Sequence, residues 1–120
     1  MGGDSRVIIG IDLGTTNSAA AVWRGGAAEL IPNSLGHFLT PSAVSLGDDD
    51  RFLVGLAARE RQPTHPDRTV TAFKRYMGTT REVKLGKRRF TAEDLSALVL
   101  AGLKADAEAY LGAPVTGAVI

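Results

Sequence analysis

The chain contains no cysteine, which excludes disulfide bonds and thiolate metal sites. No apolar run reaches the ~18 residues that a membrane-spanning helix needs. Neither sign of charge dominates, because 14 basic side chains balance 13 acidic ones, so we expect no nucleic-acid partner. The N-terminal stretch MGGDSRV lacks the apolar core of a signal peptide. These absences favour a cytoplasmic domain that does not contact a membrane.

Two common phosphate-binding motifs are also missing. No G-x-x-x-x-G-K-[ST] sequence occurs, and no G-x-G-x-x-G follows a strand, which argues against a Walker-type loop and a dinucleotide-binding fold. The chain has instead the segment IGIDLGTTNS at residues 9–18. Apolar, largely β-branched residues predict one strand over 7–13, and an apolar run predicts a second over 18–24. The segment therefore predicts two strands joined by a tight turn.

The residues of this turn suit the binding of phosphate. Gly14 has no Cβ, so the backbone can approach a ligand closely, and successive backbone N–H groups can form a concave anion site. Thr15, Thr16 and Asn17 add hydroxyl and amide groups. Asp12, which we expect to be buried on its apolar strand, is a candidate ligand of Mg²⁺ through water. An ordinary hairpin, in which Asp12 only caps the turn, is the alternative at this point.

Periodicity and turn residues predict the organisation of the rest of the chain, which is of the α/β class. We expect further strands over 27–32, 43–46 and 52–54, and helices over 56–62, 66–78 and 92–111. Thr64 with Asp67 is a candidate capping box for the second helix, and Thr91 with Asp94 for the third. Apolar residues cover more than one face of the third helix, which indicates that it packs against two neighbours.

These segments resemble a known family. IGIDLGTTNS is similar to the first phosphate motif of the actin-like ATPase superfamily, which includes sugar kinases, actin-like filament proteins and the 70-kilodalton heat-shock chaperones. Four more segments resemble the chaperones, in the same order: IPNSLGHFLTPS (31–42), FLVGLAARERQPTHPDRTVTAFKRYMG (52–78), FTAEDLSALVLAGLKADAEAYLG (90–112) and PVTGAVI (114–120). The short loop at 79–90 resembles a compact bacterial branch of these chaperones. A sugar or polyol kinase and an actin-like filament protein stay open as alternatives.

The resemblance implies a partial actin-like ATPase lobe of the ribonuclease H-like kind. It would hold a three-stranded meander and a parallel fourth strand, with an inserted α/β subdomain. The implied parts are the first portion of the phosphate-binding subdomain (1–39), the inserted subdomain (40–113) and a return strand (114–120). In the family, a second phosphate loop and the adenosine pocket follow. We therefore expect this stretch alone to be an inactive fragment that self-associates through an open sheet edge.

The resemblance also implies roles for individual residues. The turn formed by residues 14–17 would hold the phosphates of ATP or ADP, Asp12 would hold hydrated Mg²⁺, and K⁺ would help near Asp12 and Asn17. Lys74 by itself indicates only a cation favoured near a helix C-terminus. The resemblance makes Lys74 and Thr15 catalytic in ATP hydrolysis. Implied partners are unfolded client peptides, a J-domain co-chaperone and a nucleotide-exchange factor.

Overall fold

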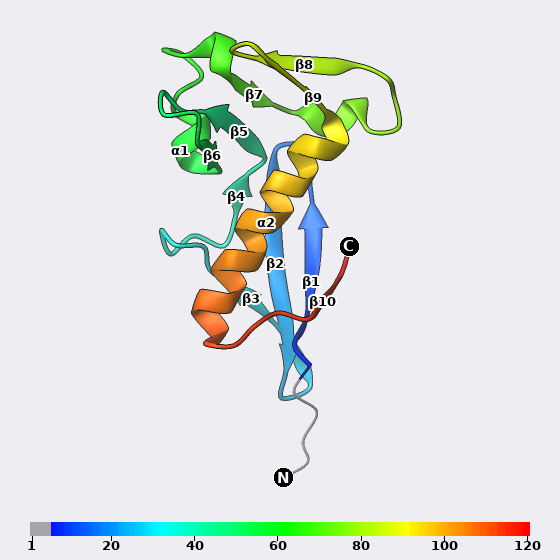
Figure 1. Ribbon diagram of the computed structural model, residues 1–120. Coiled ribbons are helices and arrows are strands. Elements are labelled where there is room, and N and C mark those ends of the chain that lie inside the picture. Colours follow the sequence, from blue (N-terminus) through cyan, green and yellow to red (C-terminus); the bar gives the residue numbers. More distant parts are fainter. Residues whose placement is uncertain (1–5) are drawn as a thin grey trace.

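The structure is a computed structural model that describes residues 6–120, so the first five residues, which belong to the stretch examined for a signal peptide, lie outside it. Within residues 6–120, the main elements are two sheets, one two-stranded hairpin and one long helix (Figure 1). Among the described residues, no helix is both long enough and apolar enough to cross a membrane.

The first sheet is the predicted meander with a parallel strand at its side. Strands β1 (Ile8–Leu13), β2 (Asn17–Arg24) and β3 (Ala27–Ile31) pair antiparallel, and β10 (Gly117–Val119) runs parallel to β1, with Gly117 opposite Ile8. The short strand β4 (Thr40–Pro41) pairs with the start of β2. The α/β class and the parallel fourth strand are therefore confirmed.

The second sheet lies beyond β4 and has the order β6-β5-β7. Its strands are β5 (Ala43–Leu46), β6 (Phe52–Val54) and β7 (Thr69–Thr71), and the short helix α1 (Leu56–Arg59) follows β6. A separate hairpin is formed by β8 (Glu82–Leu85) and β9 (Arg88–Thr91). The predicted hairpin of 43–46 with 52–54 is present, since Val44 pairs with Val54.

The predicted helix over 66–78 is wrong. This segment forms a 3₁₀ turn η1 (Pro66–Arg68), then β7, then a second 3₁₀ turn η2 (Phe73–Tyr76). The run Thr69-Val70-Thr71 is β-branched, which favours a strand, and it pairs with β5. Ala72 then adopts a left-handed conformation with φ 54°, which no helix continues through. The capping box expected at Thr64 does not form, because η1 has no side-chain cap.

The long helix α2 (Ala92–Leu111) begins and ends as predicted. The Thr91 hydroxyl accepts a hydrogen bond from the Asp94 backbone N–H at 3.1 Å, and the Asp94 carboxylate accepts one from the Thr91 N–H at 2.9 Å. Gly112 ends the helix in a left-handed conformation with φ 67°. Both halves of the capping box are therefore confirmed.

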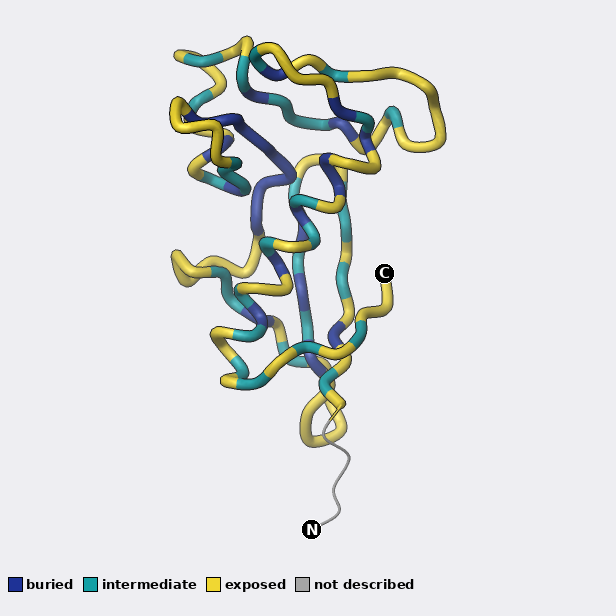
Figure 2. The backbone as a smooth tube through the Cα atoms, viewed as in Figure 1, coloured by how far each residue is buried: buried dark blue, intermediate teal, exposed yellow. Residues whose placement is uncertain are grey.

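Two apolar clusters form the core of the described residues, and α2 contributes to both. Figure 2 shows that buried positions recur along this helix. Leu95, Val99 and Leu103 pack in the larger cluster, which lies against the second sheet and the hairpin. Ala107 packs in the smaller cluster, which lies on the first sheet and includes Ile9. The prediction that this helix packs against two neighbours is confirmed.

Candidate functional site

The turn between β1 and β2 is so tight that only glycine fits at position 14. A Cβ on Gly14 would lie 2.2 Å from the Asn17 carbonyl oxygen, far inside van der Waals contact. Thr15 and Thr16 follow and are both exposed. Among the described residues, neither their backbone N–H groups nor their hydroxyls donate to any group. The turn thus presents four free hydrogen-bond donors to the solvent, as a phosphate site requires.

Two buried serines hold this turn from behind. The Ser42 hydroxyl donates to the Gly14 carbonyl oxygen at 2.7 Å and lies 2.9 Å from the Ser18 hydroxyl. The Ser42 backbone N–H donates to the Thr16 carbonyl oxygen at 2.9 Å. Sequence reasoning missed Ser18 and Ser42 as part of the site. The sequence shows these two residues only as small polar side chains in or next to predicted strands. Such side chains occur in many other environments, so they do not indicate a site.

Asp12 is exposed, so the expectation of a buried carboxylate was wrong. Alternate residues of a strand point to opposite faces, and on β1 it is Ile9 and Ile11 that face the core. The Asp12 carboxylate makes no hydrogen bond or ion pair within the described part of the chain, so it does not cap the turn either. It is therefore free to take a ligand at the open end of the strand.

The surroundings of Asp12 restrict how a metal ion would be held. No group of three or more histidine, cysteine, aspartate or glutamate side chains comes together within residues 6–120. A metal held here would therefore take most of its ligands from water and from phosphate oxygens. Mg²⁺ fits this pattern, because it keeps several waters and commonly binds through one or two carboxylates plus substrate phosphates.

Lys74 lies in η2, exposed to solvent, and its ammonium group forms no ion pair or hydrogen bond with any described residue. Its neighbour Phe73 is buried in the larger apolar cluster, and Leu13 packs against the same cluster. Leu13 precedes Gly14 and Phe73 precedes Lys74. The shared cluster thus brings the phosphate turn and the lysine turn to one region of the fold, where Figure 1 shows the β1–β2 turn reaching the end of the molecule that carries η2.

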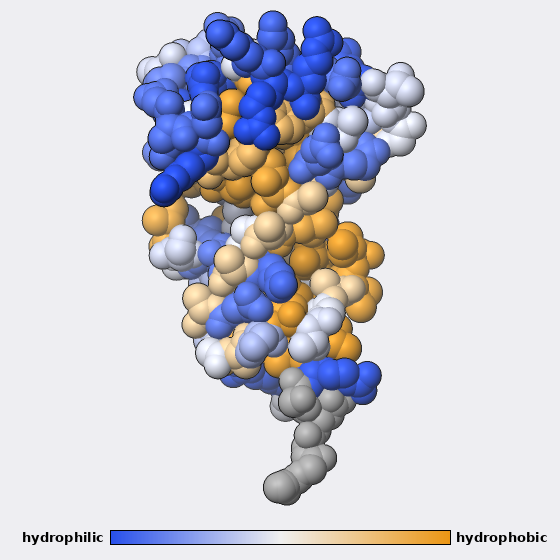
Figure 3. All heavy atoms as spheres, viewed as in Figure 1, coloured by the Kyte–Doolittle hydropathy of each residue, from blue (hydrophilic) through white to orange (hydrophobic). Residues whose placement is uncertain are grey.

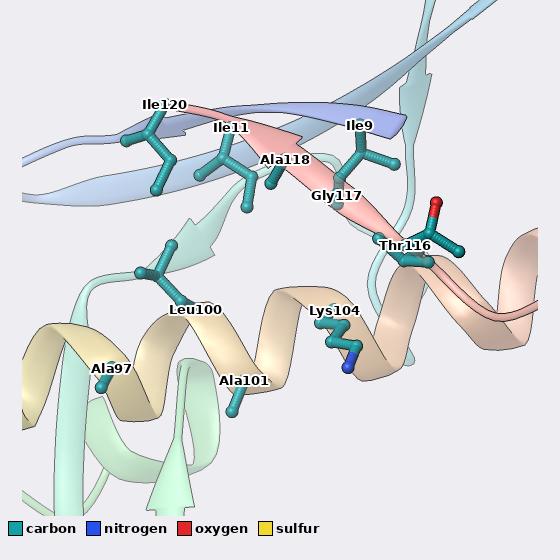
Figure 4. Close-up of a pocket in the computed structure, with 11 residues that line it drawn as sticks. Ile9, Ile11, Ala97, Leu100, Ala101, Lys104, Thr116, Gly117, Ala118 and Ile120 are labelled. Carbon is teal, nitrogen blue, oxygen red and sulfur yellow. The ribbon is translucent and has the colours of Figure 1, made fainter. Parts of the chain in front are cut away.

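A large groove lies elsewhere in the described part of the chain. It measures about 420 Å³ and runs between α2 and the strands β1 and β10. Figure 4 shows Ile11 and Ile120 on the strand side opposite Leu100 on the helix, and Lys104 is the only charged side chain among the described residues that line the groove. Figure 3 shows hydrophobic side chains gathered on this side of the molecule and hydrophilic ones over the β8–β9 end. Lys104 and Thr116 are its polar lining side chains, and the Thr116 hydroxyl already bonds Val7, so the groove suits a polyphosphate less well than the turn at residues 14–17.

A parallel strand beside an antiparallel meander, with a tight glycine turn between the first two strands, is the architecture of a partial actin-like lobe. Comparison with known families matches residues 8–85 and 79–120 to the family described as Hsp70 protein. The chain belongs to the Hsp70 family and is a chaperone of that family. This finding decides against the sugar kinases and the actin-like filament proteins. The bacterial branch and the subdomain boundaries stay predictions.

Proposed function

We propose that the intact protein binds Mg-ATP through the turn at residues 14–17 and hydrolyses it. The observation that carries this proposal is the turn itself. Gly14 admits no Cβ, and the backbone and hydroxyl donors of Thr15 and Thr16 have no partner in the described chain. A turn built this tightly, with its donors left free, fits an anion that supplies the missing acceptors.

Each residue of the site has a distinct part in this proposal. The N–H groups and hydroxyls of the turn bind the β- and γ-phosphate oxygens, and Asp12 holds hydrated Mg²⁺. Bound Mg²⁺ neutralises phosphate charge and fixes the orientation of the triphosphate. The free ammonium group of Lys74 stabilises the charge that develops on the transferred phosphoryl group, and Thr15 orients that group. K⁺ binding near Asp12 and Asn17 rests on the family resemblance alone.

The partners of the protein also belong to this proposal. Membership of the Hsp70 family supports a cycle in which hydrolysis tightens the grip on an extended client peptide. A J-domain co-chaperone and a nucleotide-exchange factor would regulate that cycle, in the cytoplasm. Residues 6–120 alone would in addition self-associate at β10, because within them β10 pairs only with β1. Val119 and Ile120 there are 68% and 72% exposed.

ATP turnover by the intact protein tests the main proposal. It is measured with Mg²⁺ and K⁺, with and without an unfolded peptide and a J-domain protein. We expect slow basal turnover that rises when both are added. Lys74→Ala should lower it by roughly 10²-fold or more, since one lost electrostatic donor commonly costs that much. Lys84→Ala removes an exposed lysine of the β8–β9 hairpin and is the matched control, expected at the wild-type rate. Turnover that ignores peptide, or an equal loss in both variants, would contradict the proposal.

A further inference from the structure

We infer that Ser42 is a positioning residue, which sets the direction of the donors in the phosphate turn and fixes that turn relative to Lys74. This inference rests on the proposed ATPase function. Ser42 lies between β4 and β5, where the chain passes from the first sheet to the second. Its side chain is buried, with 3% exposure, and all of its bonds to the first sheet go to the turn or to Ser18 next to it.

The contacts of Ser42 determine which way the peptide groups of the turn point. Its hydroxyl holds the carbonyl oxygen of Gly14, and its backbone N–H holds that of Thr16. In a planar trans peptide, the carbonyl and the N–H of the next residue point in opposite directions. Anchoring these two carbonyls at Ser42 therefore turns the N–H groups of Thr15 and Asn17 away from Ser42. For Thr15, that direction is toward the solvent, where phosphate would bind.

Ser18 completes this arrangement. A hydroxyl has a single proton, and Ser42 gives its proton to the Gly14 carbonyl oxygen, so the Ser18 hydroxyl donates to Ser42 Oγ over 2.9 Å. Donation in series polarises each successive bond and strengthens the last one. Ser18 therefore supports the bond to Gly14 without touching the turn, and its loss should be milder than the loss of Ser42.

The same serine is tied to the lysine turn through the second sheet. Its neighbour Ala43 pairs with Thr71 at the end of β7, and the β5–β7 ladder stops at this pair. The chain then passes through the left-handed Ala72 directly into η2, where Phe73 is buried and Lys74 projects. Ser42 thus stands between the two halves of the proposed site, bonded to one and adjacent to the strand pair that leads into the other.

If Ser42 had only a structural role, its buried hydroxyl would need only to be hydrogen-bonded. Ser45 has a buried, hydrogen-bonded hydroxyl as well and therefore serves as the comparison. It is fully buried on β5, three residues after Ser42, and its hydroxyl bonds to the Arg68 carbonyl oxygen, the Thr69 hydroxyl and the Arg61 guanidinium, none of which belongs to the phosphate turn. Ser45→Ala removes a buried hydroxyl of the same kind from the strand that follows Ser42. It should therefore affect stability as Ser42→Ala does, and leave the phosphate turn unchanged.

The experiment compares Ser42→Ala, Ser18→Ala and Ser45→Ala in the intact protein. Single-turnover ATP hydrolysis at saturating ATP and the dissociation constant of ADP are measured for each variant. For Ser42→Ala we expect a rate about tenfold lower, the size seen when a supporting hydrogen bond behind a site is removed, with a smaller change in ADP affinity. Ser18→Ala should lose less, and Ser45→Ala should keep the wild-type rate. Equal rates for Ser42→Ala and Ser45→Ala would overturn the inference.

Two additions keep the test decisive. If Ser42→Ala does not fold, Ser42→Thr keeps the hydroxyl and should retain turnover, and a tenfold loss there would count against positioning. If the wild-type protein shows no turnover, the proposed function fails, and the inference is then judged on ¹⁵N-labelled protein. The amide signals of Thr15 and Asn17 should move in Ser42→Ala and stay in place in Ser45→Ala. Unmoved signals in both variants would refute the positioning role by themselves.

Discussion

Replacing Gly14 by alanine tests whether the shape of the phosphate turn matters. The added Cβ would sit 2.2 Å from the Asn17 carbonyl oxygen. Carbon and oxygen atoms in close contact normally lie about 3.3 Å apart, so the turn must open by roughly 1 Å. The added Cβ would clash with a backbone atom, which cannot rotate away as the end of a flexible side chain could. We therefore expect the donors of Thr15 and Thr16 to be displaced.

The size of the effect follows from that displacement. A misplacement of about 1 Å in a catalytic arrangement costs roughly 10²-fold in rate. The fold should suffer less, with a loss of about 1–3 kcal/mol in the free energy of unfolding, the usual cost of inserting a methyl group into a full space. Since small domains are stable by roughly 5–15 kcal/mol, Gly14→Ala should still fold.

The matched control is Gly10→Ala on the same strand, four residues before the turn. The nearest atom to a Cβ there is the Ala21 carbonyl oxygen at 4.0 Å, so this methyl group fits. Urea unfolding should show wild-type stability or a gain of up to about 1 kcal/mol for Gly10→Ala. Single-turnover hydrolysis and ADP binding are then compared for both variants. If Gly14→Ala binds ADP and hydrolyses ATP as Gly10→Ala does, the turn is not the phosphate site that its geometry indicates.

Three further outcomes are expected. Thr91→Ala removes the hydroxyl that caps α2 and should lower the free energy of unfolding by about 1 kcal/mol, which corresponds to a Tm about 4 °C lower in thermal unfolding. Thr91→Ser should keep most of the cap. An unchanged Tm in Thr91→Ala would contradict this role. Burial raises the pKa of Asp106 above its ordinary 3.8, against the opposing effect of the Ser34 backbone N–H. The folded state therefore binds the proton more tightly than the unfolded state, and its stability falls as pH rises from 3.8 through the raised pKa. Urea unfolding across this range should show a smaller fall in Asp106→Asn, and an identical pH profile would refute the assignment. Val119→Lys places a charge on the exposed end of β10 and should reduce self-association. Size-exclusion chromatography with light scattering measures this change. A wild-type chain that stays monomeric up to millimolar concentration would contradict the predicted contact.

The parts of the fold that local sequence determines were predictable. The β1–β3 meander follows from apolar runs separated by turn residues, and α2 follows from a capping box and a glycine stop, all of which act within a few residues. The segment 66–78 was not predictable in this way. Pro66, Lys74 and Gly78 occupy positions that are common at the start and end of a helix. The backbone hydrogen bonds between β7 and β5 join distant parts of the chain, so a local pattern does not reveal them.

Parts of the candidate site were likewise predictable from the sequence and other parts were not. Gly14, Thr15 and Thr16 are recognisable from the sequence, because the chemistry of a phosphate turn lies in consecutive residues. Ser42 is 28 residues from Gly14, so its bond exists only once the two sheets are assembled. Asp12 was misplaced because an apolar strand suggested burial on both faces, whereas the described chain covers only the face of Ile9 and Ile11.

The position of α2 has a consequence for how the chain is made. Ala107 covers Ile9, although nearly the whole chain separates them, and the helix that carries Ala107 follows every strand except β10. At a synthesis rate of about 5–20 residues per second, the apolar face of the first sheet therefore stays uncovered for several seconds until α2 has been made. Closing contacts of such sequence separation is entropically slow. A newly made chain of this chaperone thus passes through a stage in which it resembles the unfolded clients of its own family.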